Sequence, residues 1–305
     1  MSSNFISLLT LAWHTIRAKT LTVALAVVVL SQSLAWYDLR SLHQPTLHSQ
    51  SLDFFLALII LACCLFLQIS VNLANDYFDG LSGIDTPQRL GPQRATQSGL
   101  IKPLTMRNAI FITTSIASIF GCYLILKGGW TFFFLGLLSL MGVYAYSGGK
   151  KPLASLGLGE VAVFLYFGYL AVMASYVLQT GYFNSRLFLP ATQIGLLISA
   201  IMLVNNIRDI ESDKAVGKNT LAVRIGSFYA KKLYCIFIIV PFLLIPFDHY
   251  QPYLNYLLIP VGLFLCIKIQ QSKRNQGTLF NQCLGQTSAM VLAWSLLYLG
   301  SLALG

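Results

Sequence analysis

Long apolar runs separated by short polar segments dominate this chain of 305 residues. Each run is close to the length that an α-helix needs to cross the hydrocarbon core of a bilayer, which is roughly 20 residues. The pattern therefore predicts an all-α, polytopic membrane bundle, with residues 1–305 forming a single transmembrane domain because no soluble-domain-sized insert interrupts the runs. The nine predicted helices cover residues 21–37, 54–73, 109–126, 130–146, 161–178, 190–204, 233–247, 253–269 and 287–299.

The basic residues fall in alternate connections between these helices, as the positive-inside rule requires of a correct set of spans. With the N-terminus inside, 17 of the 20 Lys and Arg residues are cytoplasmic, and only Arg40, Lys127 and Arg186 are not. This orientation places the C-terminus outside. The net charge of +10 then reflects topology beside membrane lipid, so we expect no nucleic-acid partner.

Two short polar segments, residues 72–85 and 205–213, hold six of the ten acidic residues. In a chain that is 56% hydrophobic and 10% charged, carboxylates at the ends of apolar helices are costly and normally mark a site. Both segments lie on the predicted cytoplasmic face. The helical spacing puts Asn72, Asn75, Asp76 and Asp79 on one stripe, and Asn205, Asp209 and Asp213 on another.

A stripe of carboxylates one turn apart repels itself, so these segments require cations between or opposite their members. Mg²⁺ fits best, because it takes oxygen ligands and is usually shared between a few carboxylates and substrate phosphates. Basic residues in the same two loops add an anion site. Acids, a metal and basic residues at the mouth of an apolar bundle indicate a polyprenyl diphosphate as substrate. The basic residues are Arg89, Arg94, Lys102, Lys214 and Lys218.

The two segments resemble the signature motifs of the intramembrane aromatic prenyltransferases of the UbiA superfamily. The first motif is Asn75-Asp-x-x-Asp79 followed by Asp85, and the second runs from Asn205 through Asp209 and Asp213 to Gly226. Within the superfamily, residues 72–77 and 91–99 look most like the 1,4-dihydroxy-2-naphthoate polyprenyltransferases of menaquinone biosynthesis, which also carry the late acid at Asp85 in place of one at Gly83.

The resemblance implies nine helices around a lipid-open cavity and an Mg²⁺-dependent reaction, in a bacterial cytoplasmic (inner) membrane. The polyprenyl group would pass from its diphosphate to 1,4-dihydroxy-2-naphthoate, with loss of CO₂ and diphosphate, to give demethylmenaquinone. Carried over by position, it assigns metal binding and catalysis to Asp79, Asp85, Asp209 and Asp213. With the neighbouring amide, charged and aromatic residues, the candidate substrate-binding residues are Asn72, Asn75, Asp76, Arg89, Arg94, Lys102, Tyr146, Lys151, Asn205, Arg208 and Lys218.

Other readings remain open at this point. The same chemistry on another ring, such as 4-hydroxybenzoate or homogentisate, is the nearest rival, since the acceptor pocket has no sharp sequence code. A cation-coupled secondary transporter is a different class, but its acids would lie near the bilayer midplane rather than at helix ends. Single residues also have ordinary roles: Asp76 suits a helix cap, Asn72 a contact between helices, and Glu160 the start of the fifth helix.

Overall fold

The computed structural model describes residues 11, 13, 15–41, 51–81, 91, 94–149, 152–273 and 276–305. In this part of the chain nine apolar segments run as helices, which confirms the predicted all-α membrane bundle. The first five are α2 (Ala18–Ser41), α3 (Phe54–Leu81), α4 (Pro103–Gly128), α5 (Trp130–Ala145) and a composite of α6 (Gly159–Val163), π-helical η2 (Phe164–Ala171) and α7 (Val172–Thr180). The other four are α8 (Phe188–Arg208), α10 (Leu221–Leu244), η5 (Tyr253–Leu258) continuing into α11 (Ile259–Gln271), and α12 (Gly277–Leu304).

Eight of these segments are long and apolar enough to cross a membrane, whereas α5, which ends one residue before its predicted end, is a shorter apolar helix. Its 16 residues span about 24 Å, less than a typical hydrocarbon core of about 30 Å. Other helices extend beyond the predicted apolar runs: α3 continues to Leu81, eight residues past the expected end at Leu73. This extension places Asp76 and Asp79 on helical turns.

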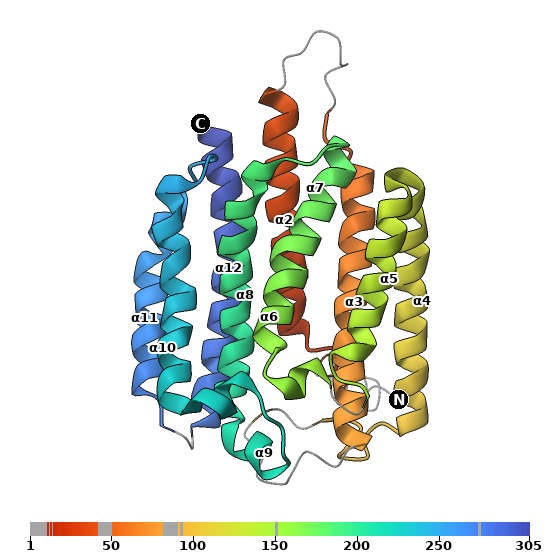
Figure 1. The fold of residues 1–305 in the computed structure, drawn as a ribbon, viewed down its shortest axis with the longest axis vertical. Helices are drawn as coiled ribbons and strands as arrows, with labels where there is room; N and C mark the ends of the chain where they lie inside the picture. The colour runs from red at the N-terminus through yellow and green to blue at the C-terminus, as the bar shows by residue number, and fades with distance from the viewer. Residues whose placement is uncertain are drawn as a thin grey trace, which may run out of the picture.

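The helices alternate in direction, so the first and the last of the nine run the same way, and the start of α2 and the end of α12 lie at opposite ends of the bundle (Figure 1). The C-terminal ends of α3 and α8 lie at the same end, together with the short helix α9 (Ile210–Ala215). Both acidic segments therefore meet at one end of the bundle, called the site end below, as expected from the predicted topology.

The main core joins both halves of the chain. Buried apolar side chains of α2, α8, α10 and α12 form one cluster, and Tyr234 and Trp294 are among its largest fully buried members. Small residues allow close helix contacts: a Cβ on Gly168 of η2 would lie 2.7 Å from the carbonyl oxygen of Ala191 in α8. Helices that cannot rely on the hydrophobic effect in lipid associate through such tight packing.

The end of the bundle opposite the site carries a buried polar cluster. Asp38 of α2 accepts hydrogen bonds from the hydroxyls of Tyr176 (2.6 Å) and Tyr250 (2.8 Å), and Asp248 accepts one from the hydroxyl of Tyr298 (2.7 Å). Asp248 lies in the turn after η4 (Ile245–Phe247), and its second carboxylate oxygen accepts the backbone N–H of Tyr250 (3.1 Å). These bonds connect α2, α7 and α12 to one another through the turn after η4.

Burial raises the pKa of Asp248 to about 6, although its hydrogen bonds from Tyr298 and the Tyr250 amide pull the pKa down. Because the folded protein holds this proton more tightly than the unfolded chain, the contribution of Asp248 to stability is complete below about pH 4 and is lost as the pH rises through 6. We expect Asp248→Asn to remove this loss, which amounts to up to about 3 kcal/mol. Denaturation in detergent followed by circular dichroism at pH 4 to 7 measures it. Glu211→Gln, at an exposed acid, should keep the wild-type profile, and an unchanged profile in Asp248→Asn would contradict the assignment.

Candidate active site

A cavity of about 500 Å³ opens between α2, α3, α4, α5, η2, α7 and α8. Its inner walls are apolar, with side chains such as Leu67, Phe132 and Ile198, and its polar lining comes mainly from the site end. Of the predicted site residues, the cavity brings together Asn72, Asn75, Asp79, Arg94, Tyr146, Asn205, Asp209, Asp213 and Lys218. Side chains that lie 137 residues apart, such as Asn72 and Asp209, thus share one chamber.

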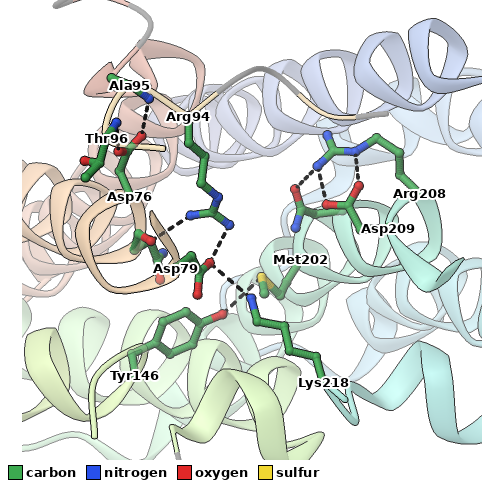
Figure 2. A network of polar contacts seen from close by, with 12 residues as sticks. Asp76, Asp79, Arg94, Ala95, Thr96, Tyr146, Met202, Arg208, Asp209 and Lys218 are labelled. Carbon is green, nitrogen blue, oxygen red and sulfur yellow. Dashed lines mark hydrogen bonds and ion pairs between the residues drawn. The ribbon is translucent and has the colours of Figure 1, made fainter. Parts of the chain in front are cut away.

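Asp79 is the meeting point of the two motifs. It lies near the end of α3, 7% exposed, and its Oδ2 forms ion pairs with the guanidinium of Arg94 and with Nζ of Lys218, the latter at 3.1 Å. Figure 2 shows the two cations reaching Asp79 from different loops. Buried charges in a membrane protein are stable only when they are paired, so this carboxylate joins the loop after α3 to the loop after α9.

Asp76 positions Arg94 by binding the backbone of the two residues that follow it. The carboxylate of Asp76 accepts the backbone N–H groups of Ala95 (3.1 Å) and Thr96 (2.9 Å), and Arg94 itself donates to the carbonyl of Asn75 (2.7 Å). Gly80 lets this loop lie directly on α3, since a Cβ there would come within 2.9 Å of the Thr96 Cβ. Asp76 therefore points at the loop rather than into the cavity.

The spacing of the second motif predicts one continuous helix, but in the structure the helix is interrupted. The helix α8 ends at Arg208, Asp209 takes φ −98° and ψ 8°, and α9 begins at Ile210. The guanidinium of Arg208 donates hydrogen bonds to both carboxylate oxygens of Asp209, each at 2.7 Å. It also donates to the side-chain carbonyl oxygens of Asn205 (2.8 Å) and of Asn281 in α12 (2.7 Å). The break still leaves Asn205, Asp209 and Asp213 on the cavity wall.

The turn after α9 delivers Lys218 to the first motif. Gly217 has φ +75°, a conformation that glycine adopts without strain, and the backbone N–H of Lys218 donates to the carbonyl of Asp213 (2.8 Å). The chain reverses there, and the ammonium group of Lys218 reaches across to Asp79. The backbone hydrogen bond fixes the turn that carries Lys218, and the ion pair with Asp79 joins that turn to the first motif.

The donor set suits Mg²⁺, which prefers oxygen ligands. Asp79, Asp209 and Asp213 line the same cavity, with the amides of Asn75 and Asn205 beside them. Within the described residues, no three acidic, His or Cys side chains are gathered into a ready-made metal centre. That arrangement fits an ion held by one or two carboxylates and completed by substrate phosphates, the usual mode for Mg²⁺.

Some predicted site residues lie elsewhere. Lys102 is exposed at the start of α4, and neither it nor Asp76 or Arg208 lines the cavity. Asn72 lines it but donates to the Ile16 carbonyl (2.8 Å) and the Thr20 hydroxyl (3.0 Å), so its amide connects α3 to the start of α2. The predicted residues Asp85, Arg89 and Lys151 fall outside the described part of the chain.

The cavity also contains polar residues that sequence reasoning missed. Arg17 lines it, and so does Asn206, which bonds the buried carboxylate of Glu160 (2.8 Å). Asn206 sits within a recognised motif but was not singled out, and Glu160 was interpreted as a helix-start residue. Their pairing joins α6 to α8, and a single sequence carries no signal for a contact between residues 46 positions apart.

Comparison with known proteins agrees with this geometry. The sequence profile of the UbiA prenyltransferase family matches residues 46–281. The chain belongs to the UbiA prenyltransferase family. It is 38% identical to the 1,4-dihydroxy-2-naphthoate octaprenyltransferase of Escherichia coli (strain K12), over 73% of this chain and 71% of that protein. It is 35% identical to the protein of the same name from Haemophilus influenzae, over 75% of this chain and 73% of that protein.

Solved structures of other UbiA proteins share the fold. A UbiA homologue from Archaeoglobus fulgidus bound to GPP and Mg²⁺ superposes with a TM-score of 0.64 over 95% of this chain and 99% of that one, at 14% identity. The same homologue bound to DMAPP and Mg²⁺ gives a TM-score of 0.62. This UbiA prenyltransferase is accordingly an integral membrane protein with the family's helical bundle.

The buried Arg208–Asp209 ion pair should contribute to the free energy of unfolding of this UbiA prenyltransferase. Removing one partner of a buried ion pair leaves the other charge uncompensated, which typically costs about 3 kcal/mol. We expect Arg208→Met to lower the free energy of unfolding by about that amount, and Arg208→Met combined with Asp209→Asn to recover part of it. Chemical denaturation without substrate measures both. Arg186→Met, at an exposed arginine, should have little effect. No recovery in the double variant would show that the pair is not the cause.

Proposed function

We propose that this protein transfers a polyprenyl group from polyprenyl diphosphate to 1,4-dihydroxy-2-naphthoate in an Mg²⁺-dependent reaction. One observation carries the proposal: Asp79, Asp209, Asp213, Arg94 and Lys218 converge at the polar end of a cavity whose remaining walls are apolar. An anion with a long hydrocarbon tail matches this division. The relatives named as 1,4-dihydroxy-2-naphthoate octaprenyltransferases support the choice of acceptor.

Two groups of residues would bind the diphosphate. Asp79, Asp209 and Asp213, with Asn75 and Asn205, would hold Mg²⁺, and Asp85 joins them by sequence. When bound, Mg²⁺ supplies positive charge that stabilises the departing diphosphate. Arg94 and Lys218, which already converge on Asp79, would bind the phosphate oxygens directly. The roles of Arg89 and Lys151 remain predictions from sequence.

The apolar part of the cavity would bind the isoprenoid tail and exclude water from the allylic cation. Tyr146 and Tyr166 line this space, and their aromatic faces are suited to stabilising a cation. The ring carbon that bears the carboxylate then attacks the cation, and the carbon–carbon bond to that carboxylate breaks to release CO₂. The electron pair of the broken bond returns to the ring, so the ring keeps its oxidation level, no oxidant is needed, and the product is the quinol form of demethylmenaquinone.

The acceptor assignment can be tested directly. Purified protein receives labelled polyprenyl diphosphate with 1,4-dihydroxy-2-naphthoate, 4-hydroxybenzoate or homogentisate, each with and without Mg²⁺. We expect prenylation of the naphthoate alone, lost when the metal is chelated, and reduced at least 100-fold by Asp79→Asn or Asp213→Asn. Asp248→Asn, the same change at the opposite end of the bundle, should retain activity. Prenylation of 4-hydroxybenzoate alone would overturn the naphthoate assignment.

We further propose that residues 1–305 form one domain, since the main core contains side chains from Val23 to Leu302. The site end would face the cytoplasm of a bacterial inner membrane, with the N-terminus inside and the C-terminus outside. The support is the distribution of Lys and Arg, 17 of 20 of which lie in the predicted inner connections.

Reporter fusions test this orientation. Alkaline phosphatase, which is active only in the periplasm, should be active when fused after Gly305 and inactive when fused after Lys218. Green fluorescent protein, which folds in the cytoplasm, should give the opposite pair of results because the two sites lie on opposite sides of the membrane. Phosphatase activity at Lys218 with none at Gly305 would reverse the proposed orientation.

A further inference from the structure

Glu160 is a buried carboxylate that the diphosphate site does not use. It lies at the start of α6 with 2% of its surface exposed. Its Oε1 accepts a hydrogen bond from Nδ2 of Asn206 in α8 (2.8 Å), and its Oε2 has no hydrogen-bond partner among the described residues. A buried carboxyl group with a single bond is costly in an apolar bundle, so its position calls for a role beyond packing.

The packing of α6 against α8 does not rest on this carboxylate alone. The hydroxyl of Ser199 donates to the backbone carbonyl of Glu160 (3.1 Å), and Gly159 packs beside Met202. Within the part of the chain that the structure describes, the one side chain that bonds the carboxylate of Glu160 is Asn206. The acid therefore sets the orientation of that amide.

Asn206 is where the pair meets the cavity. Its NH₂ group is directed at Glu160, so its carbonyl oxygen, on the other branch of the same planar amide, is left to the cavity that Asn206 lines. Its neighbour Asn205 differs, because the carbonyl oxygen of that amide already accepts from Arg208 (2.8 Å). A carboxylate can only accept hydrogen bonds, so Glu160 fixes which way the Asn206 amide faces.

Tyr146 and Met202 form a wall close to this amide. The hydroxyl of Tyr146 donates to the Met202 sulfur (3.2 Å), and both residues line the cavity. A Cβ on Gly159 would lie 3.4 Å from the Tyr146 hydroxyl, so the segment that carries Glu160 runs directly alongside this wall. An aromatic ring and a thioether make a surface suited to a flat apolar ring.

We propose that Asn206 and Glu160 form the subsite for the hydroxyl of the aromatic acceptor. The Asn206 carbonyl oxygen accepts a hydrogen bond from a ring hydroxyl, and Glu160 is the positioning residue that holds the amide. A carbonyl oxygen backed by a carboxylate repels a diphosphate, which offers only acceptors, and suits a hydroxyl, which donates. This inference rests on the proposed function, because it takes the acceptor to be a hydroxylated naphthoate.

The test measures binding of three naphthoates without prenyl diphosphate or Mg²⁺, by fluorescence titration of the protein in detergent. The ligands are 1,4-dihydroxy-2-naphthoate and its two analogues that lack one hydroxyl, 1-hydroxy-2-naphthoate and 4-hydroxy-2-naphthoate. We expect Glu160→Leu and Asn206→Ala each to weaken binding of the dihydroxy compound about tenfold, the equivalent of one hydrogen bond. The loss should vanish for the analogue that lacks the contacted hydroxyl and persist for the other.

Conservative and matched variants separate positioning from packing. Glu160→Gln keeps an oxygen that accepts from Asn206, so its affinity should stay within about threefold of wild type, while Ser199→Ala removes only the backbone contact and should bind all three normally. In steady-state assays Glu160→Leu should raise KM for the naphthoate and leave KM for polyprenyl diphosphate unchanged. Thermal unfolding checks that each variant is folded. If Glu160→Leu does not fold, the binding data for Asn206→Ala test the subsite.

Three results would overturn the subsite: equal weakening for all three naphthoates, a parallel rise in KM for polyprenyl diphosphate, or an equal loss in Glu160→Gln and Glu160→Leu. Failure of the proposed function looks different, since the wild-type protein would then prenylate another ring and not the naphthoate. In that case 4-hydroxybenzoate is compared with benzoate in the same variants. The subsite stands if the loss depends on the hydroxyl and falls if it does not.

Discussion

The ion pairs around Asp79 are the interaction on which the site depends. One carboxylate, buried at the end of α3, holds a cation from each of the two polar segments, Arg94 and Lys218. In a largely apolar bundle each of these charges would be unfavourable alone. Because they are mutually dependent, the two loops are fixed at the mouth of the cavity, and the cations are already in place where a diphosphate would bind.

Two other acids at the site end, Asp76 and Asp209, are each held by partners of their own. Asp76 has the same chemistry as Asp79, three residues away, but its two oxygens are used by the Ala95 and Thr96 amides. Asp209 accepts hydrogen bonds from Arg208, which also donates one to Asn281 of α12. Buried polar groups that are fully bonded rigidify their surroundings, so these pairs set the positions of the side chains that face the cavity.

The two ends of the bundle handle buried acids in different ways. At the site end Asp79 and Asp209 pair with Arg and Lys side chains, which suits a region that binds an anion and a metal. At the opposite end the hydrogen-bond partners of Asp38 and Asp248 among the described residues are tyrosine hydroxyls, an asparagine and a backbone amide. Neutral donors of this kind fix helices to one another without creating a charged pocket.

Sequence patterns determined the spans, the directions of the helices and the two polar segments, because hydrophobic length and the spacing of charges are local properties of the chain. The same patterns identified Asp79, Asp209, Asp213, Arg94 and Lys218 as residues that belong together. The sequence could not assign different roles to the members of one stripe. Asp76 lies on the same turns as Asp79 but bonds the loop after α3, and the predicted second stripe is interrupted at Asp209.

Only the tertiary structure decided which polar groups face the cavity and which are consumed by their neighbours. Asn206 and Glu160 are joined across 46 residues, and Asp79 and Lys218 across 139, by the packing of helices that the chain order does not reveal. Hydrogen bonds and ion pairs act over about 3 Å, so their partners depend on the rotation and depth of each helix in the bundle. A pattern of apolar residues defines a helix and its lipid-facing length, but it does not define that rotation or depth.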